Sequence, residues 1–343
     1  MDGPGAGRAL SHYHLITTDA GGRGSVIRVA VLFPGQGSQY VGMADPWMEH
    51  PHGRKILEAA SAVLGWDVAD TSRDADALKR TDIVQPAVFT CDVAAFEVLK
   101  AEGIPCHVAA GHSLGEYAAL VASGAVEFES GLSALATRAT AMASASTGNP
   151  GTMTALIGMS PEEAREVCEV AGRGDVLAVA NENGPKQTVL SGSLSAIERA
   201  EEVARSRGAK AVRLNVAGAF HSPLMTSAVQ PVREAISRIH FATPDFPLIP
   251  NASGKPTSQP LVLRDLLSRH LISAVRWDAS MRAMAEMGVT HVLEAGPGDV
   301  LGKLARRAIP DAAVRSVATP DDARSAAADI RAASAQSPTE EAP

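Results

Sequence analysis

The sequence predicts an α/β fold in which a larger subdomain with a parallel sheet carries an inserted smaller subdomain. Strand-like and helix-like segments alternate along residues 27–147, the order changes to βαββαβ between about 152 and 217, and the alternation then returns. Alternation favours a parallel sheet covered by helices, and βαββαβ is typical of a ferredoxin-like unit. We therefore expect residues 27–147 and 218–318 to form the larger subdomain and residues 148–217 the smaller one.

The length and composition are those of a globular chain. With 343 residues, 45% of them apolar, it can bury one large core and a smaller one. Residues 1–26 are rich in glycine and polar residues, and residues 319–343 are rich in Ala, Ser, Pro and Glu. Neither end has a sustained hydrophobic period, so both are predicted to be disordered tails.

The elements of the larger subdomain follow from periodicity and turn residues. A β-branched apolar run at 26–33 ends at Pro-Gly and predicts a buried strand, and helical patterns follow at 54–64 and 85–102. A second strand is expected at 108–110, before a helix that begins near Glu116. After the insertion the expected order is a helix at 222–239, a short strand at 246–249, helices within 261–288 and a strand at 290–294.

The smaller subdomain begins with an expected strand at 153–159. A helix follows, marked by Ser160 as N-cap and Pro161 at the first helical position. The remaining elements are strands at 176–181 and 187–192 around a turn at 182–185, a helix at 194–207 and a strand at 209–216.

Charge and composition exclude several classes of partner. A net charge of −7 with scattered cations argues against a nucleic-acid-binding surface. No apolar run reaches the ~20 residues that span a bilayer, and no secretory signal is present, so we expect a cytoplasmic protein without membrane contact. Because Cys91, Cys106 and Cys168 are widely spaced, they favour buried thiols over a disulfide or a metal site.

The segment Gly-His-Ser-Leu-Gly at 111–115 lies between an expected strand and an expected helix. This context is typical of a nucleophile elbow, in which a serine hydroxyl is exposed on a tight turn at a helix N-terminus. Ser113 is therefore the candidate nucleophile. An ordinary turn in a glycine-rich chain is the alternative reading of this segment alone.

A serine hydroxyl needs a base within hydrogen-bond reach, and ten histidines supply the candidates. His221 follows the last strand of the inserted unit in a turn of small residues, from which its side chain could return to the elbow. The pattern alone does not decide for it. Six others fall in the predicted tail, in a Pro-containing loop or in strands, where other roles are commoner: His12, His14, His50, His52, His107 and His291.

Four motifs in order carry a resemblance to a known family. They are Phe-Pro-Gly-Gln-Gly-Ser-Gln at 33–39, Gly-His-Ser-Leu-Gly-Glu at 111–116, Gly-Ala-Phe-His-Ser at 218–222 and Glu-Ala-Gly-Pro-Gly at 294–298. Over about residues 27–315 the chain resembles the malonyl-CoA:acyl-carrier-protein transacylases and the acyltransferase domains of polyketide synthases. The resemblance implies an α/β-hydrolase-like larger subdomain with an inserted ferredoxin-like one.

The resemblance also implies the reaction. Ser113 would attack the thioester of malonyl-CoA or a related acyl-CoA while His221 takes its proton, and the acyl group would then pass to the pantetheine thiol of an acyl carrier protein. Such an enzyme serves fatty-acid or polyketide synthesis. It needs no metal or cofactor, and we expect it to act as a monomer.

Further residues match the family's site. The backbone N–H groups of Gln36 and Leu114 would hold the oxyanion, and Arg138 would grip the malonyl carboxylate, which a guanidinium can bind through two parallel hydrogen bonds. His270, where a glutamine is usual, would orient His221 through its backbone carbonyl. Asn251 is assigned to the same supporting region.

Other positions bear on specificity. Phe220 resembles the malonyl-selective version of its motif, whereas Gly218 stands where such domains often carry histidine and is expected to widen the pocket. Ala143 stands where the family commonly carries a glutamine. His112, whose side chain is expected to point away from Ser113, and Asn183 are also assigned to substrate binding. Malonyl-CoA is expected to be preferred over methylmalonyl-CoA.

Two other functions are compatible with the same residues. In an acyl-thioester hydrolase, water would discharge the acyl-serine; an unrelated α/β-hydrolase would need a histidine near the C-terminal strands, where His291 lies within an expected strand. A catalytically silent protein that holds a carrier protein is the third reading. The presence of Ser113, His221 and Arg138 argues against a catalytically silent protein.

Overall fold

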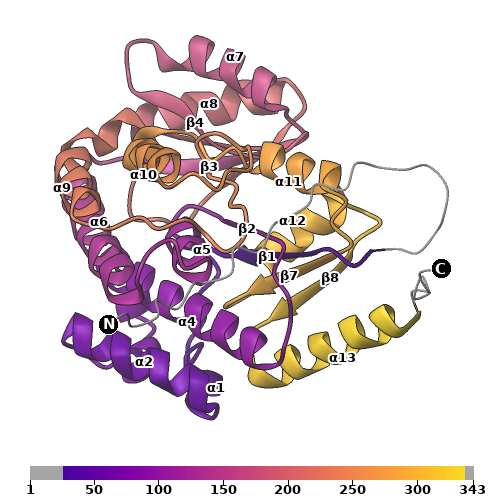
Figure 1. The fold of residues 1–343 in the computed structure, drawn as a ribbon. Helices are drawn as coiled ribbons and strands as arrows, with labels where there is room; N and C mark the ends of the chain where they lie inside the picture. The colour runs from indigo at the N-terminus through magenta and orange to yellow at the C-terminus, as the bar shows by residue number, and fades with distance from the viewer. Residues whose placement is uncertain (1–25, 337–343) are drawn as a thin grey trace, which may run out of the picture.

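The computed structural model describes residues 26–336. Its central sheet has four parallel strands in the order β2-β1-β7-β8 (Figure 1). The strands are β1 (Val29–Phe33), β2 (Val108–Gly111), β7 (His291–Ala295) and β8 (Ala313–Val317). The carboxyl ends of β1 and β2 therefore meet at one edge, where parallel sheets place their sites.

Helices cover the central sheet on both faces. Alternate side chains of β1 point to opposite faces of the sheet. Val29, Val31 and Phe33 belong to the largest buried cluster, whereas Ala30 and Leu32 belong to a second cluster that includes Trp277. The helices of the larger subdomain are α1 (Asp45–Met48), α2 (Pro51–Leu64), α3 (Val68–Ser72), α4 (Thr81–Ala101), α5 (Gly115–Ala122), α6 (Phe128–Gly148), α9 (Thr226–Ser237), α10 (Pro260–Arg269), α11 (Trp277–Glu286), α12 (Val300–Ala308) and α13 (Pro320–Gln336), with short 3₁₀ turns at η1 (Ala77–Lys79), η2 (Pro223–Met225) and η3 (His270–Ile272).

A second, antiparallel sheet forms the smaller subdomain, at the top of Figure 1. Its order is β4-β5-β3-β6, from β3 (Thr152–Ile157), β4 (Leu177–Gly184), β5 (Gln187–Gly192) and β6 (Lys210–Arg213). Helices α7 (Pro161–Gly172) and α8 (Leu194–Ser206) pack on it around a separate core. Ser160 caps α7 in a reciprocal capping box with Glu163. The predicted α/β fold with an inserted ferredoxin-like unit is confirmed.

Two local expectations are corrected. Instead of the strand expected at 246–249, Leu248 forms isolated bridges with Ala109 and Thr257, because prolines on either side of it interrupt the ladder. His50 is the N-cap residue of helix α2, without a side-chain capping bond, and His52 lies inside the helix, not in a loop.

The tail expected at 319–343 is wrong for residues 320–336, which form α13. The buried side chains of this helix are mostly small, and Ala323, Ala326 and Ile330 pack in the larger core. The remainder of that tail, at 337–343, lies outside the described residues, as does the tail expected over 1–26 except for its last residue.

Within residues 26–336, no helix is long and apolar enough to cross a membrane. The three cysteines are free thiols, and burial raises the pKa of each, that of Cys168 to about 12. In the same part of the chain, no group of three or more His, Cys, Asp or Glu side chains is arranged to hold a metal ion.

Candidate active site

Ser113 lies on the turn between β2 and α5, at the carboxyl edge of the central sheet. Its φ of 53° is left-handed, a conformation that non-glycine residues rarely adopt outside strained turns. The flanking glycines make the turn sterically feasible: a Cβ on Gly111 would lie 1.9 Å from Gly115, and a Cβ on Gly115 would lie 2.2 Å from the Phe33 carbonyl oxygen. The segment is therefore an elbow and not an ordinary turn.

His221 Nε2 lies 2.8 Å from Ser113 Oγ. The other ring nitrogen, Nδ1, faces two backbone carbonyl oxygens, of His270 at 3.2 Å and of Ser273 at 3.1 Å. Because carbonyl oxygens only accept hydrogen bonds, Nδ1 carries the proton and Nε2 presents its lone pair to the serine hydroxyl. Ser113 therefore donates to His221.

Burial keeps the imidazole of His221 neutral. Desolvation, with smaller effects from Arg138 and His112, lowers its pKa to about 3, although its bonds to the two carbonyls oppose the shift. A neutral imidazole with a free lone pair is the form that accepts a proton.

Arg138, on α6, brings a cation to the same hydroxyl. Its Nη2 lies 3.0 Å from Ser113 Oγ, while Nη1 donates to the side-chain oxygen of Gln85. The residue is 1% exposed, and no carboxylate of the described residues forms an ion pair with it. Burial lowers its pKa, which the charges of Tyr117 and Glu116 oppose. A buried guanidinium without an anionic partner is costly, and a ligand carboxylate would supply that partner.

Gln85 was not among the predicted residues. It is a fully buried polar side chain inside the apolar helix α4, and it also donates to the Gln36 side-chain oxygen over 3.4 Å. Its only sequence signal is polarity within an apolar helical pattern. It links the loop after β1 to Arg138.

Gln36 and Leu114 follow β1 and β2 at the same edge of the sheet. In the part of the chain that the structure describes, neither backbone N–H donates to another protein group. Leu114 is the N-cap of α5, so its N–H belongs to the positive end of that helix. Both donors remain available to an anion.

Among residues 26–336, Asn251 forms no hydrogen bond with His221, so it does not orient that histidine as the sequence predicts. Its side-chain oxygen accepts from the Ser113 backbone N–H at 2.8 Å, and its nitrogen donates to the Gly111 carbonyl. It supports the elbow, and the Ser273 carbonyl, which the sequence did not indicate, is the second group that orients the histidine beside His270.

The His270 imidazole is a separate feature. It is 1% exposed and its ring centroid lies 5.1 Å from that of His221, but neither ring nitrogen has a hydrogen-bond partner within residues 26–336. Burial holds its pKa well below the ordinary value. The side chain is therefore neutral and packs beside the histidine that its own carbonyl orients.

His112 and Asn183 bond each other. His112 Nε2 lies 3.0 Å from the Asn183 side-chain oxygen, and the His112 ring packs against Trp277. Because Asn183 belongs to β4, this bond joins the smaller subdomain to the residue before the nucleophile.

Gly218 does not widen a pocket, contrary to expectation. A Cβ at this position would lie 2.0 Å from Ser146 Oγ and 3.3 Å from the Phe220 ring. Ser146 therefore already occupies the space that a side chain would take. Phe220 is buried, and Ala143 lies on α6, one turn beyond Arg138, and is half-buried.

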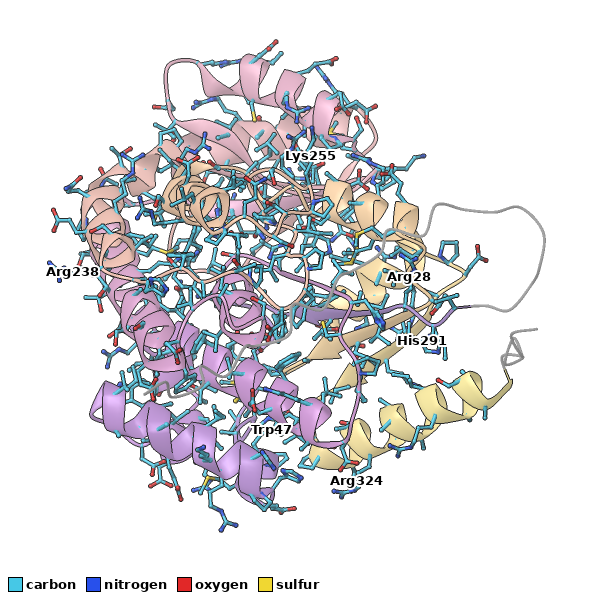
Figure 2. All side chains as sticks on the ribbon, in the orientation of Figure 1. Arg28, Trp47, Arg238, Lys255, His291 and Arg324 are labelled. Atoms are coloured by element: carbon cyan, nitrogen blue, oxygen red, sulfur yellow. The ribbon has the colours of Figure 1, made fainter. Side chains whose placement is uncertain are left out.

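The alternative base, His291, lies at the wrong end of the sheet. It opens β7 level with Val29, whereas Gly111 pairs with Phe33, four residues further along β1 and roughly 13 Å away at 3.3 Å per residue. Figure 2 shows His291 beside Arg28, where β1 begins. Its Nδ1 bonds Thr290, and His107 similarly accepts from the Val29 N–H, so both are satisfied polar residues.

The fold and site together define an α/β enzyme with a serine-histidine pair in place of a Ser-His-Asp triad. A family model described as "Acyl transferase domain" matches residues 31–331. The chain belongs to this acyl transferase family.

Individual relatives and solved structures agree with this family assignment. The chain is 37% identical to the malonyl CoA-acyl carrier protein transacylase of Escherichia coli K12 over 286 residues, covering 82% of this chain and 92% of that protein. The Bacillus subtilis 168 protein of the same name is 36% identical over 285 residues, covering 82% and 90%.

Among solved structures, the Coxiella burnetii transacylase has a TM-score of 0.85 at 33% identity, covering 90% of this chain and 99% of that one. A malonyl-transacylase solved in complex with its type II polyketide acyl carrier protein has a TM-score of 0.84 at 31% identity, covering 88% and 99%.

Proposed function

We propose that this enzyme transfers a malonyl group from coenzyme A to the phosphopantetheine thiol of an acyl carrier protein through an ester on Ser113. The names of the relatives support this reaction, as does a relative solved in complex with its carrier protein. The observation that carries the choice of acyl group is Arg138, a buried cation that touches the nucleophile and has no anionic partner within residues 26–336.

In the first half-reaction, Ser113 Oγ attacks the thioester carbonyl carbon and its proton passes to His221 Nε2. The C–S bond then breaks, the thiolate of coenzyme A takes that proton, and the malonyl ester remains. The N–H groups of Gln36 and Leu114 stabilise the oxyanion, and Arg138, held by Gln85, binds the malonyl carboxylate.

The second half-reaction reverses these steps with the carrier thiol. His221 takes the thiol proton, the sulfur attacks the ester carbonyl, and Ser113 leaves and regains its proton. The chain's own groups supply every proton transfer in this scheme without a cofactor. We also propose that the enzyme works as a cytoplasmic monomer, which light scattering of the purified protein would test for its oligomeric state.

The test is intact-protein mass spectrometry after incubation with malonyl-CoA, methylmalonyl-CoA or acetyl-CoA, followed by addition of a pantetheinylated carrier protein. We expect malonyl labelling that Ser113→Ala abolishes and that the carrier protein removes. Equal labelling by methylmalonyl-CoA would reject the malonyl preference. Loss of the label to water at one rate, with or without carrier protein, would identify a thioester hydrolase.

A further inference from the structure

Glu116 is a buried carboxyl group that the proposed reaction does not use. It lies in the first turn of α5, three residues after the nucleophile, and is 5% exposed. Its Oε2 accepts a hydrogen bond of 2.8 Å from the backbone N–H of Asn251. Burial raises the pKa of Glu116 to about 7, against the effects of that N–H and of Arg138. No described cation forms an ion pair with it.

The partner of Glu116 in turn holds the elbow. Asn251 is fully buried, and its side chain bonds the Ser113 N–H on one side and the Gly111 carbonyl on the other. These groups lie 138 and 140 residues away in sequence, so the asparagine is the tie between the elbow and the loop after Leu248. Leu248, at the start of that loop, forms an isolated bridge with Ala109 of β2.

The backbone conformation of Ser113 depends on these hydrogen bonds from Asn251. A left-handed φ at a non-glycine residue persists only where surrounding contacts fix it. Asn251 provides such contacts on both sides of the turn, and its own backbone is fixed by Glu116 and by the bond from the Arg276 N–H to the Asn251 carbonyl. Without an acceptor at Glu116, the Asn251 N–H would be buried and unpaired.

We propose that Glu116 is a positioning residue for the nucleophile, acting through Asn251 to hold the backbone of Ser113 in its reactive conformation. This inference rests on the proposed role of Ser113. The contact requires an acceptor oxygen and not a charge, because a carboxyl group keeps an acceptor oxygen in either protonation state. Glutamine should therefore replace Glu116, and an apolar side chain of similar volume should not.

The experiment compares Glu116→Gln with Glu116→Met. Methionine is unbranched and fills the same space but cannot accept the Asn251 N–H. Two quantities are measured: kcat and KM for malonyl transfer, and the rate at which a serine-directed sulfonyl fluoride modifies Ser113. The second reading needs neither malonyl-CoA nor carrier protein, so it stays informative even if the proposed function fails.

For Glu116→Met we expect kcat and the modification rate to fall about 10- to 100-fold with KM within about twofold, as for a small misplacement of a reacting group. Glu116→Gln should stay within about threefold of the unmodified enzyme in both. The proposal would be overturned if Glu116→Met had the same kcat and Ser113 modification rate as the original enzyme. It would also be overturned if Glu116→Gln lost as much of both as Glu116→Met.

A double-mutant cycle tests the route through Asn251. If Glu116 acts through it, Asn251→Ala should lower the modification rate and Glu116→Met should add nothing in that background. If the two substitutions lowered the modification rate independently, so that their fold-losses multiplied, Glu116 would not act through Asn251. Glu201→Met is the matched control, a buried glutamate of α8 that pairs with Arg213 in the smaller subdomain and should leave both rates unchanged. Thermal unfolding of each variant identifies losses that come from misfolding, and rescue by glutamine separates positioning from stability.

Discussion

Ser113 and His221 hydrogen-bond each other, and both have a left-handed backbone, with φ of 53° and 57°. Among the described non-glycine residues only Arg173 shares that conformation, at a helix end. Strain of this kind costs about 1–3 kcal/mol for each residue and persists where packing fixes it. The two residues that meet at the reacting hydroxyl are thus both held in strained turns.

His221→Ala should lower the rate of Ser113 acylation by about 100- to 10,000-fold, the range for loss of a general base. Because burial lowers the pKa of His221 to about 3, the neutral base persists as pH falls, and the acylation rate should not decline through pH 6.5. The measurement is single-turnover acylation between pH 5 and 8, repeated in Glu116→Gln to remove the titration of that group. A midpoint near 6.5 in both proteins would contradict it.

Arg138→Ala should lower malonyl labelling about 100-fold while labelling by acetyl-CoA persists, because only the malonyl group carries a carboxylate that needs the guanidinium. Arg138→Lys should recover part of the loss, since an ammonium keeps the charge but not the paired donors. Initial rates with the two acyl-CoAs give the ratio. If labelling fell equally with malonyl-CoA and acetyl-CoA, Arg138 would act on Ser113 and not on the malonyl carboxylate.

His270 should make the protein less stable in acid. Its folded-state pKa is depressed, so its contribution to stability is present above the unfolded value of 6.5 and is lost as pH falls below it. Between pH 8 and pH 5 this loss is about 2 kcal/mol for one histidine. In His270→Gln the pH dependence of urea unfolding should be shallower by that amount. Identical slopes in the two proteins would show that His270 protonates in the folded state.

Gly218→Ala should destabilise the protein by about 1–3 kcal/mol, because the new Cβ would overlap Ser146 Oγ. Ser146→Gly should relieve much of this cost in the double variant, since it removes both the hydroxyl and the Cβ that the alanine would meet. Thermal unfolding of the two single variants and the double variant gives the coupling. Additive losses would mean that the clash is relieved elsewhere.

The sequence was most informative where a residue and its structural context are neighbours in the chain. Ser113 lies in a motif whose glycines and flanking elements define its turn, and the βαββαβ order of the smaller subdomain is local as well. His221 and Arg138 came from motif resemblance and a helix position, and the structure brings both to the serine hydroxyl.

Long-range contacts explain the rest. Asn251 was assigned to the wrong partner because its contacts lie more than a hundred residues away, and a single asparagine in a turn does not indicate them. The sequence alone predicts a wider pocket at Gly218, because Ser146, which fills the space beside it, lies on another element. Helix α13 was mistaken for a tail because an alanine-rich, weakly apolar composition resembles disorder until a close-packed partner surface is known.

The hydrogen bond between His112 and Asn183 has a mechanical consequence. Any hinge-like displacement of the ferredoxin-like unit must either break that contact or pull on the residue adjoining the reactive alcohol. The position of the smaller subdomain is therefore linked through this hydrogen bond to the backbone beside Ser113. A partner that shifts the smaller subdomain would therefore also act on the backbone next to Ser113.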